Sequence, residues 1–110
     1  MRVFGLVVLS AAFAGGIVGC APAGEEQEVR LVIENHQFQP AEVTVPAGKR
    51  IKLVIENRDD SAEEFESHTL KAEKVVGPKA TIYIGPLNSG RYEFFGEFNP
   101  QTATGKLIAQ

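Results

Sequence analysis

The sequence predicts an all-β protein whose short strands form a sandwich or a barrel. Two observations carry this prediction. Apolar and polar residues alternate along short runs from Val29 to the end of the chain. Such alternation gives a strand one buried face, because successive side chains point to opposite sides of it. Clusters of Gly, Pro, Asn and Asp separate the runs at short spacing, which is typical of sandwiches and barrels.

The expected strands follow one another with few interruptions. Apolar residues break the alternation at Val32, Val54, Phe95 and Ile108, and we expect them under loops or at a sheet edge. The stretch Ser61–Glu66 is compatible with one helical turn, and no segment carries a convincing helical stripe. The alternating runs are Val29–Ile33, Glu42–Val45, Ile51–Glu56, Thr81–Ile84, Arg91–Phe94 and Leu107–Ala109. The turn signals are Asn35–His36, Pro46–Gly48, Asn57–Asp60, Gly77–Pro78, Gly85–Pro86, Asn88–Gly90 and Asn99–Pro100.

The N-terminal residues have the pattern of a secretory leader. A basic start at Arg2 precedes an apolar run from Val3 to Val18, which is short and rich in Gly and Ala for a membrane span. The run ends at Cys20 in a motif that resembles a bacterial lipobox, whose Cys is lipidated and becomes the first mature residue. Cleavage after Ala23 is the alternative; lipidation is favoured because a lone thiol is unusual in a secreted protein.

This interpretation divides the chain into three parts. We expect a lipoprotein signal peptide over residues 1–19, a lipidated Cys20 with a polar tether over 20–28, and one domain over 29–110. The domain would be held at a membrane of the bacterial cell envelope, on the periplasmic side or at the surface.

Composition excludes several classes of function. The single Cys rules out an intramolecular disulfide, a Cys-based zinc site and an iron–sulfur cluster. The net charge is −3 and the basic residues are scattered, which argues against nucleic-acid binding. The sequence holds no catalytic triad, phosphate loop or dinucleotide fingerprint, so we expect a protein that is not an enzyme.

Several segments resemble cupredoxins, the family that includes the blue-copper proteins. The resemblance covers nearly the whole domain and rests on the order and spacing of its elements. It implies a Greek-key cupredoxin-like β-sandwich of about seven to eight short strands. The matching segments are Phe38–Gly48 (first hairpin), Ile51–Asn57 (next strand), Gly85–Phe95 (turn and strand) and Tyr92–Ile108 (metal loop and flanking strands).

A narrower resemblance is to the cupredoxin-like domain of EfeO-type iron-uptake lipoproteins. Those domains lie in the bacterial envelope, are fused to or encoded beside iron-permease components, and are thought to bind copper or iron. The resemblance implies an iron permease or another envelope metal-transport component as a partner. It is carried by Glu63–Ser67, Leu70, Glu73–Val76, Gly96–Asn99 and Ala103–Gly105.

The cupredoxin resemblance also locates the metal-ligand positions. The first His of the family maps to Glu63, the Cys to Gly96, the second His to Asn99 and the Met to Ala103. A type 1 copper centre needs a thiolate and two imidazoles. None stands at these positions, so blue-copper electron transfer is excluded.

The same end of the domain is instead rich in oxygen ligands. We expect Glu63 and Glu97 to flank the metal position, with Asn99 beside them. Carboxylate and amide oxygens suit Fe(III), Mn(II) or Ca(II) better than Cu(I). Glu64 and Glu66 would lie on the opposite face of an extended strand, as further ligands or as a solvated acidic edge.

The two histidines are further candidate ligands. His36 lies in a predicted turn and His68 in a predicted loop or strand end, and either imidazole could bind Cu(II) or iron. The competing interpretations are a turn residue packed on Phe38 and an ordinary loop histidine.

The sequence thus predicts a lipid-anchored envelope domain that binds iron or copper for an iron-uptake or metal-handling system. The alternative is a metal-free interaction module that docks a permease or another envelope partner.

Overall fold

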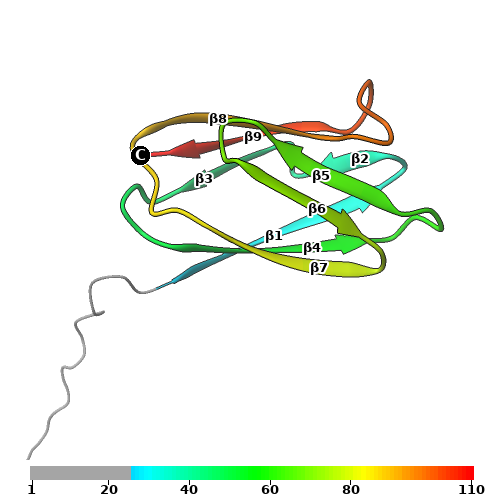
Figure 1. Cartoon of the computed structure of the whole chain (residues 1–110), viewed down its shortest axis with the longest axis horizontal. Coiled ribbons are helices and arrows are strands. Elements are labelled where there is room, and N and C mark those ends of the chain that lie inside the picture. Colours follow the sequence, from blue (N-terminus) through cyan, green and yellow to red (C-terminus); the bar gives the residue numbers. More distant parts are fainter. Residues whose placement is uncertain (1–25) are drawn as a thin grey trace, which may run out of the picture.

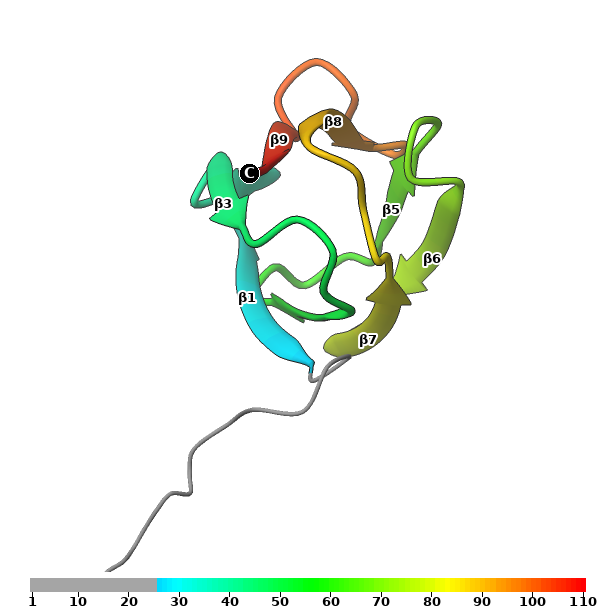
Figure 2. The same cartoon turned by 90° about the vertical axis from the view of Figure 1, so that its left-hand side faces the viewer.

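The computed structural model describes residues 26–110, so the predictions for the leader and for Cys20 lie outside the described residues. The described chain is all-β, with two sheets packed face to face (Figures 1 and 2). The predicted all-β sandwich is confirmed. The strands are β1 (Gln27–Glu34), β2 (Gln37–Gln39), β3 (Glu42–Val45), β4 (Ile51–Asn57), β5 (Glu63–Ser67), β6 (Ala72–Val76), β7 (Lys79–Ile84), β8 (Gly90–Gly96) and β9 (Thr104–Ala109).

Both sheets mix parallel and antiparallel pairs. One sheet has the order β2-β1-β4-β7 and the other β3-β9-β8-β5-β6. The parallel pairs are β1 with β4 and β3 with β9, while the other pairs are antiparallel. The chain therefore crosses between the sheets after β2, β3, β4, β6 and β7, as in a Greek-key sandwich.

The count of nine strands exceeds the predicted number because three strands have a weak alternating pattern. Strand β2 has only three residues, and β6 is largely exposed. Strand β5 replaces the helical turn considered for Ser61–Glu66. Its inward residues are Glu63, Phe65 and Ser67, two of which are polar, so hydropathy alone does not reveal its buried face. The first strand also begins at Gln27, slightly before the predicted start of the domain.

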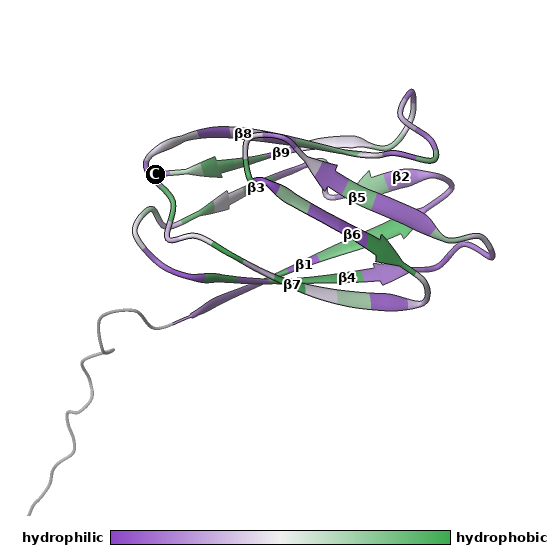
Figure 3. Cartoon of the chain, in the orientation of Figure 1, coloured by the Kyte–Doolittle hydropathy of each residue, from purple (hydrophilic) through white to green (hydrophobic). Residues whose placement is uncertain are grey.

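The core lies between the sheets and is centred on three aromatic rings. Phe38 and Phe94 meet edge to face with centroids 5.1 Å apart, and Phe65 lies 5.2 Å from Phe94. Hydrophobic and hydrophilic segments both occur along the strands of the two sheets, as Figure 3 shows in green and purple. Of the residues that break the sequence pattern, Val54 is buried and Val32, Phe95 and Ile108 are half-buried. Within residues 26–110 there is no helix of the length and hydrophobicity needed to cross a membrane.

Candidate functional site

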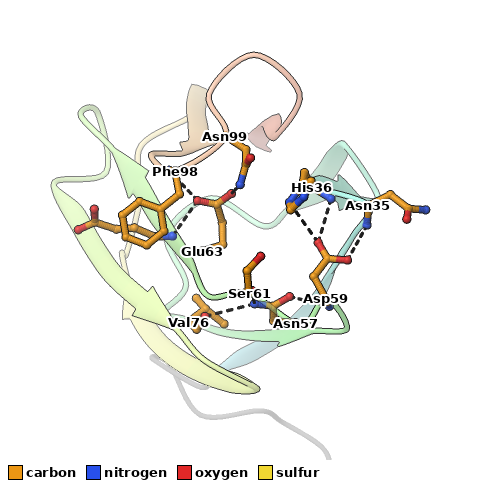
Figure 4. Close-up of polar contacts among 10 residues, drawn as sticks. Asn35, His36, Asn57, Asp59, Ser61, Glu63, Val76, Phe98 and Asn99 are labelled. Carbon is orange, nitrogen blue, oxygen red and sulfur yellow. Dashed lines mark hydrogen bonds and ion pairs between the residues drawn. The ribbon is translucent and has the colours of Figure 1, made fainter.

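Glu63 opens β5 and turns its carboxylate into the interior, where it is 2% exposed. Its Oε1 accepts hydrogen bonds from the backbone N–H groups of Glu64 (2.9 Å) and Phe98 (2.8 Å). Its Oε2 accepts one from Asn99 Nδ2 at 2.8 Å. These contacts join the start of β5 to the loop between β8 and β9 (Figure 4). A buried charge is tolerated where such donors surround it.

Gly96 and Ala103, the other two family ligand positions, lie beside the Glu63 carboxylate. The Gly96 N–H donates to Ala103 O at 2.8 Å, and Asn99 N–H donates to Gly96 O at 3.1 Å. A Cβ added to Gly96 would lie 2.5 Å from Glu63 Cδ, 2.6 Å from its Oε2 and 2.8 Å from Ala103 Cβ. The structure thus brings together the four positions that the resemblance assigned, Glu63, Gly96, Asn99 and Ala103.

This arrangement does not fit a type 1 copper ion. The four side chains offer no thiolate and no imidazole, the ligands that such a centre requires. The space next to Gly96 is taken by the Glu63 carboxylate, whose oxygens already accept protein donors.

A second group of carboxylates lies on the outer face of β5 and β6. Carboxylate oxygens of Glu64, Glu66 and Glu73 all lie within 4.8 Å of one another. Glu66 pairs with Glu73 across the two strands, and Glu64 is the next outward residue on β5. These three residues and Glu97, whose charge acts on Glu64 and Glu66, are the outer acidic cluster.

Two carboxyl groups of the outer acidic cluster, those of Glu64 and Glu66, have pKa values raised above their ordinary value of 4.5. A hydrogen bond with Glu73 is the main cause of the raised pKa of Glu64, followed by desolvation and the charges of Glu73, Glu66 and Glu97. Desolvation is the main cause for the raised pKa of Glu66, followed by the charges of Glu73 and Glu97, while His68 opposes the shift. The cluster therefore favours binding of protons or cations.

The predicted ligands fall into three places rather than one. Glu63 and Asn99 are together inside, whereas Glu97 lies with Glu64 and Glu66 outside, so the structure does not pair Glu63 with Glu97. Sequence reasoning missed Glu73. Residues 68–71 contain no Gly, Pro, Asn or Asp, so no turn signal in the sequence marks the hairpin that places Glu73 opposite Glu66.

The two histidines have different surroundings. His68 follows β5, packs against Phe95 with ring centroids 5.5 Å apart, and shares a depression with Glu66 and Glu73. His36 lies in the tight turn between β1 and β2, away from the outer acidic cluster in sequence and strand order. Asn35 and His36 both have positive φ, 57° and 58°, as expected for a two-residue hairpin turn of type I′.

Asp59 fastens this turn to the loop after β4. Its Oδ1 accepts from Asn35 N–H at 2.8 Å and its Oδ2 from His36 N–H at 2.9 Å (Figure 4). Asn57 supports the loop, because its Oδ1 accepts from Asp59 N–H and its Nδ2 donates to Ser61 O and Val76 O. Asp59 is thus a turn-capping residue, in agreement with the turn predicted at Asn57–Asp60.

These contacts make acid stability depend on Asp59. The hydrogen bond from His36 N–H, then that from Asn35 N–H, lowers the pKa of Asp59 below its usual 3.8. A lowered pKa stabilises the fold above 3.8, and that stability is lost as the pH falls through the folded-state value. We expect Asp59→Asn to flatten the pH dependence of the urea midpoint below 3.8. The control is Asp60→Asn at the exposed neighbouring residue, which should keep the pH dependence of the wild type. If the urea midpoints of the two variants depended on pH in the same way, the capping role of Asp59 would be contradicted.

The chain belongs to the cupredoxin-like domain family, whose sequence model matches residues 5–109. A related sequence is "Uncharacterized protein RP394" of Rickettsia prowazekii (strain Madrid E), which is 48% identical over 83 residues. That match covers 74% of this chain and 66% of the relative, so the chain spans about two thirds of the relative's length.

Solved structures show the same fold at low sequence identity. The metal-binding domain of the Streptococcus pneumoniae D39 Cu(I)-exporting P-type ATPase CopA superposes with a TM-score of 0.69 at 19% identity, covering 83% of this chain and 91% of that one. Auracyanin A, a blue copper protein of Chloroflexus aurantiacus, gives 0.67 at 11% identity, covering 78% and 100%. A copper-binding protein in the apo form gives 0.68 at 17% identity, covering 83% and 93%.

Proposed function

We propose that this domain handles iron or copper in the bacterial cell envelope and binds the metal ion at the outer acidic cluster. The observation that carries the proposal is the convergence of Glu64, Glu66 and Glu73 oxygens within 4.8 Å in a member of the cupredoxin-like family. Carboxylate oxygens suit Fe(III) and are acceptable to Cu(II). The domain would serve as a binding protein and not as an enzyme.

Two further features extend the proposal to a cellular role. The resemblance to EfeO-type domains favours iron uptake, with an iron permease or another envelope metal-transport component as partner. The lipobox-like motif ending at Cys20 favours attachment to the membrane through a lipid. A diacylglyceryl group with a third acyl chain would anchor the domain firmly, where a single chain would be marginal.

Removal of two cluster acids tests the metal site. We expect the purified protein to bind Cu(II) or Fe(III) in calorimetric titrations, and the double variant Glu64→Gln/Glu73→Gln to bind at least about tenfold more weakly, since even second-shell partners contribute about 10- to 100-fold. The matched control is Glu28→Gln on β1, in the opposite sheet. Equal, weak binding in all three proteins would instead favour the metal-free interaction module.

The same double variant should bind metal more weakly but make the metal-free protein more stable. A hydrogen bond with Glu73 is the main cause of the raised pKa of Glu64, and desolvation is the main cause of the raised pKa of Glu66, with the charges of neighbouring acids adding to both. A raised pKa means that the ionised carboxylate is unfavourable in the folded protein, so the cluster destabilises the fold above these pKa values and this cost falls as the pH falls toward 4.5. Removing charges should therefore raise the metal-free urea midpoint at neutral pH while it reduces the stabilisation that added metal provides. If the double variant merely misfolded, its metal-free urea midpoint and its stabilisation by metal would both be lower than those of the wild type.

The interaction module remains the second candidate because the interior carboxylate, and not a metal ligand set, occupies the family's metal position. A domain of this kind would present its loops to a permease or another envelope protein without needing an ion.

A further inference from the structure

We propose that Glu63 is a permanent internal substitute for the metal ion of the fold, so that its carboxylate, rather than an ion, holds the loop of residues 97–102 against β5. Three donors point at the Glu63 carboxylate. Oε1 accepts two backbone N–H groups and Oε2 accepts the Asn99 amide. A carboxylate is the side-chain group that accepts all three without offering a competing donor.

The residues at the other three family ligand positions complement the Glu63 carboxylate in size and hydrogen bonding. Gly96 has no Cβ, and any Cβ there would lie 2.6 Å from Glu63 Oε2. Ala103 is fully buried, and its methyl carbon would lie 2.8 Å from a Cβ built on Gly96. Asn99 supplies a donor in place of a ligand. Each residue is thus complementary to the carboxylate of Glu63, and the four form one network rather than a damaged metal site.

A metal ion bound at this position would have to displace existing hydrogen bonds of the Glu63 carboxylate. An ion at this position would break the hydrogen bonds from Phe98 and Asn99 and leave partly buried donors without their carboxylate acceptor, which is unfavourable. The Phe98 N–H has Glu63 Oε1 as its partner, while the Phe98 side chain is 53% exposed. The loop therefore keeps one conformation in the absence of metal, and an ion bound by this domain lies elsewhere.

Amide hydrogen exchange of Phe98 tests this inference directly. In EDTA-treated wild-type protein we expect the Phe98 amide to be protected, and its exchange to become at least about tenfold faster in Glu63→Ala, because the acceptor is gone. Addition of Cu(II) or Fe(III) should leave Phe98 protection unchanged. The internal reference is the Ala47 amide, which donates to Gln110 O at 3.1 Å. Figure 1 shows the C-terminus at the opposite end of the sandwich from the loop between β8 and β9.

The conservative variant Glu63→Gln separates a hydrogen-bonding role from metal ligation. Its oxygen can still accept from Glu64 and Phe98, and Asn99 can turn its amide to present oxygen to the new NH₂ group. The Phe98 amide should therefore stay protected from hydrogen exchange in EDTA-treated Glu63→Gln. This variant tests the proposal even if Glu63→Ala does not fold. Unprotected Phe98 in EDTA-treated wild type or in Glu63→Gln, or protection that appears only with metal, would overturn the proposal.

Discussion

Replacement of Phe65 with Ala should lower the free energy of unfolding by about 3–5 kcal/mol, the usual loss for a buried Phe. Phe65 is fully buried at the centre of β5, where its ring lies 5.2 Å from that of Phe94 and 6.0 Å from that of Phe38. Truncation removes the contacts of this ring with both sheets and leaves a cavity between them. The loss is a large fraction of a typical total stability of about 5–15 kcal/mol.

Urea unfolding followed by circular dichroism measures this effect. The matched control is Phe98→Ala, because Phe98 is 53% exposed and its truncation should change the unfolding free energy by no more than about 0.5 kcal/mol. Comparable losses in the two variants would contradict the placement of the aromatic core. A loss well under 1 kcal/mol in Phe65→Ala would do the same.

Gly96→Ala should destabilise the fold by about 1–3 kcal/mol through overpacking. The new methyl group would lie 2.5 Å from Glu63 Cδ and 2.8 Å from Ala103 Cβ. The Glu63 carboxylate cannot swing away freely because three donors hold it in a buried position. The control is Gly77→Ala, since a Cβ at Gly77 meets nothing within 4 Å.

A double-mutant cycle tests whether the destabilisation by Gly96→Ala arises from contact with Glu63. In a Glu63→Ala background the atoms nearest the new methyl group are gone, so the added cost of Gly96→Ala should shrink toward what contact with Ala103 alone imposes. Strictly additive losses would show that Gly96 and Glu63 act independently, in conflict with the geometry of the network.

The β-sandwich and the lack of type 1 copper ligands at the family's metal positions were predictable from the sequence. Alternation in runs such as Ile51–Glu56 depends only on neighbouring residues, because the pleat of a strand sets its period. The missing thiolate and imidazoles at Gly96 and Asn99 followed from a resemblance in order and spacing. The opposite faces of Glu63 and Glu64 also follow from this period once the segment is known to be extended.

The tertiary structure decided which acids share a site. Glu73 joins Glu64 and Glu66 because β6 pairs with β5 in one particular register, and register depends on turn geometry and packing rather than on local hydropathy. Glu63 turns away from Glu97 because its carboxylate finds donors in a loop more than thirty residues later, at Phe98 and Asn99. A sequence shows which groups can ligate a metal, but only the packing of distant segments decides whether a carboxylate faces an ion, a solvent-exposed neighbour or the protein's own donors.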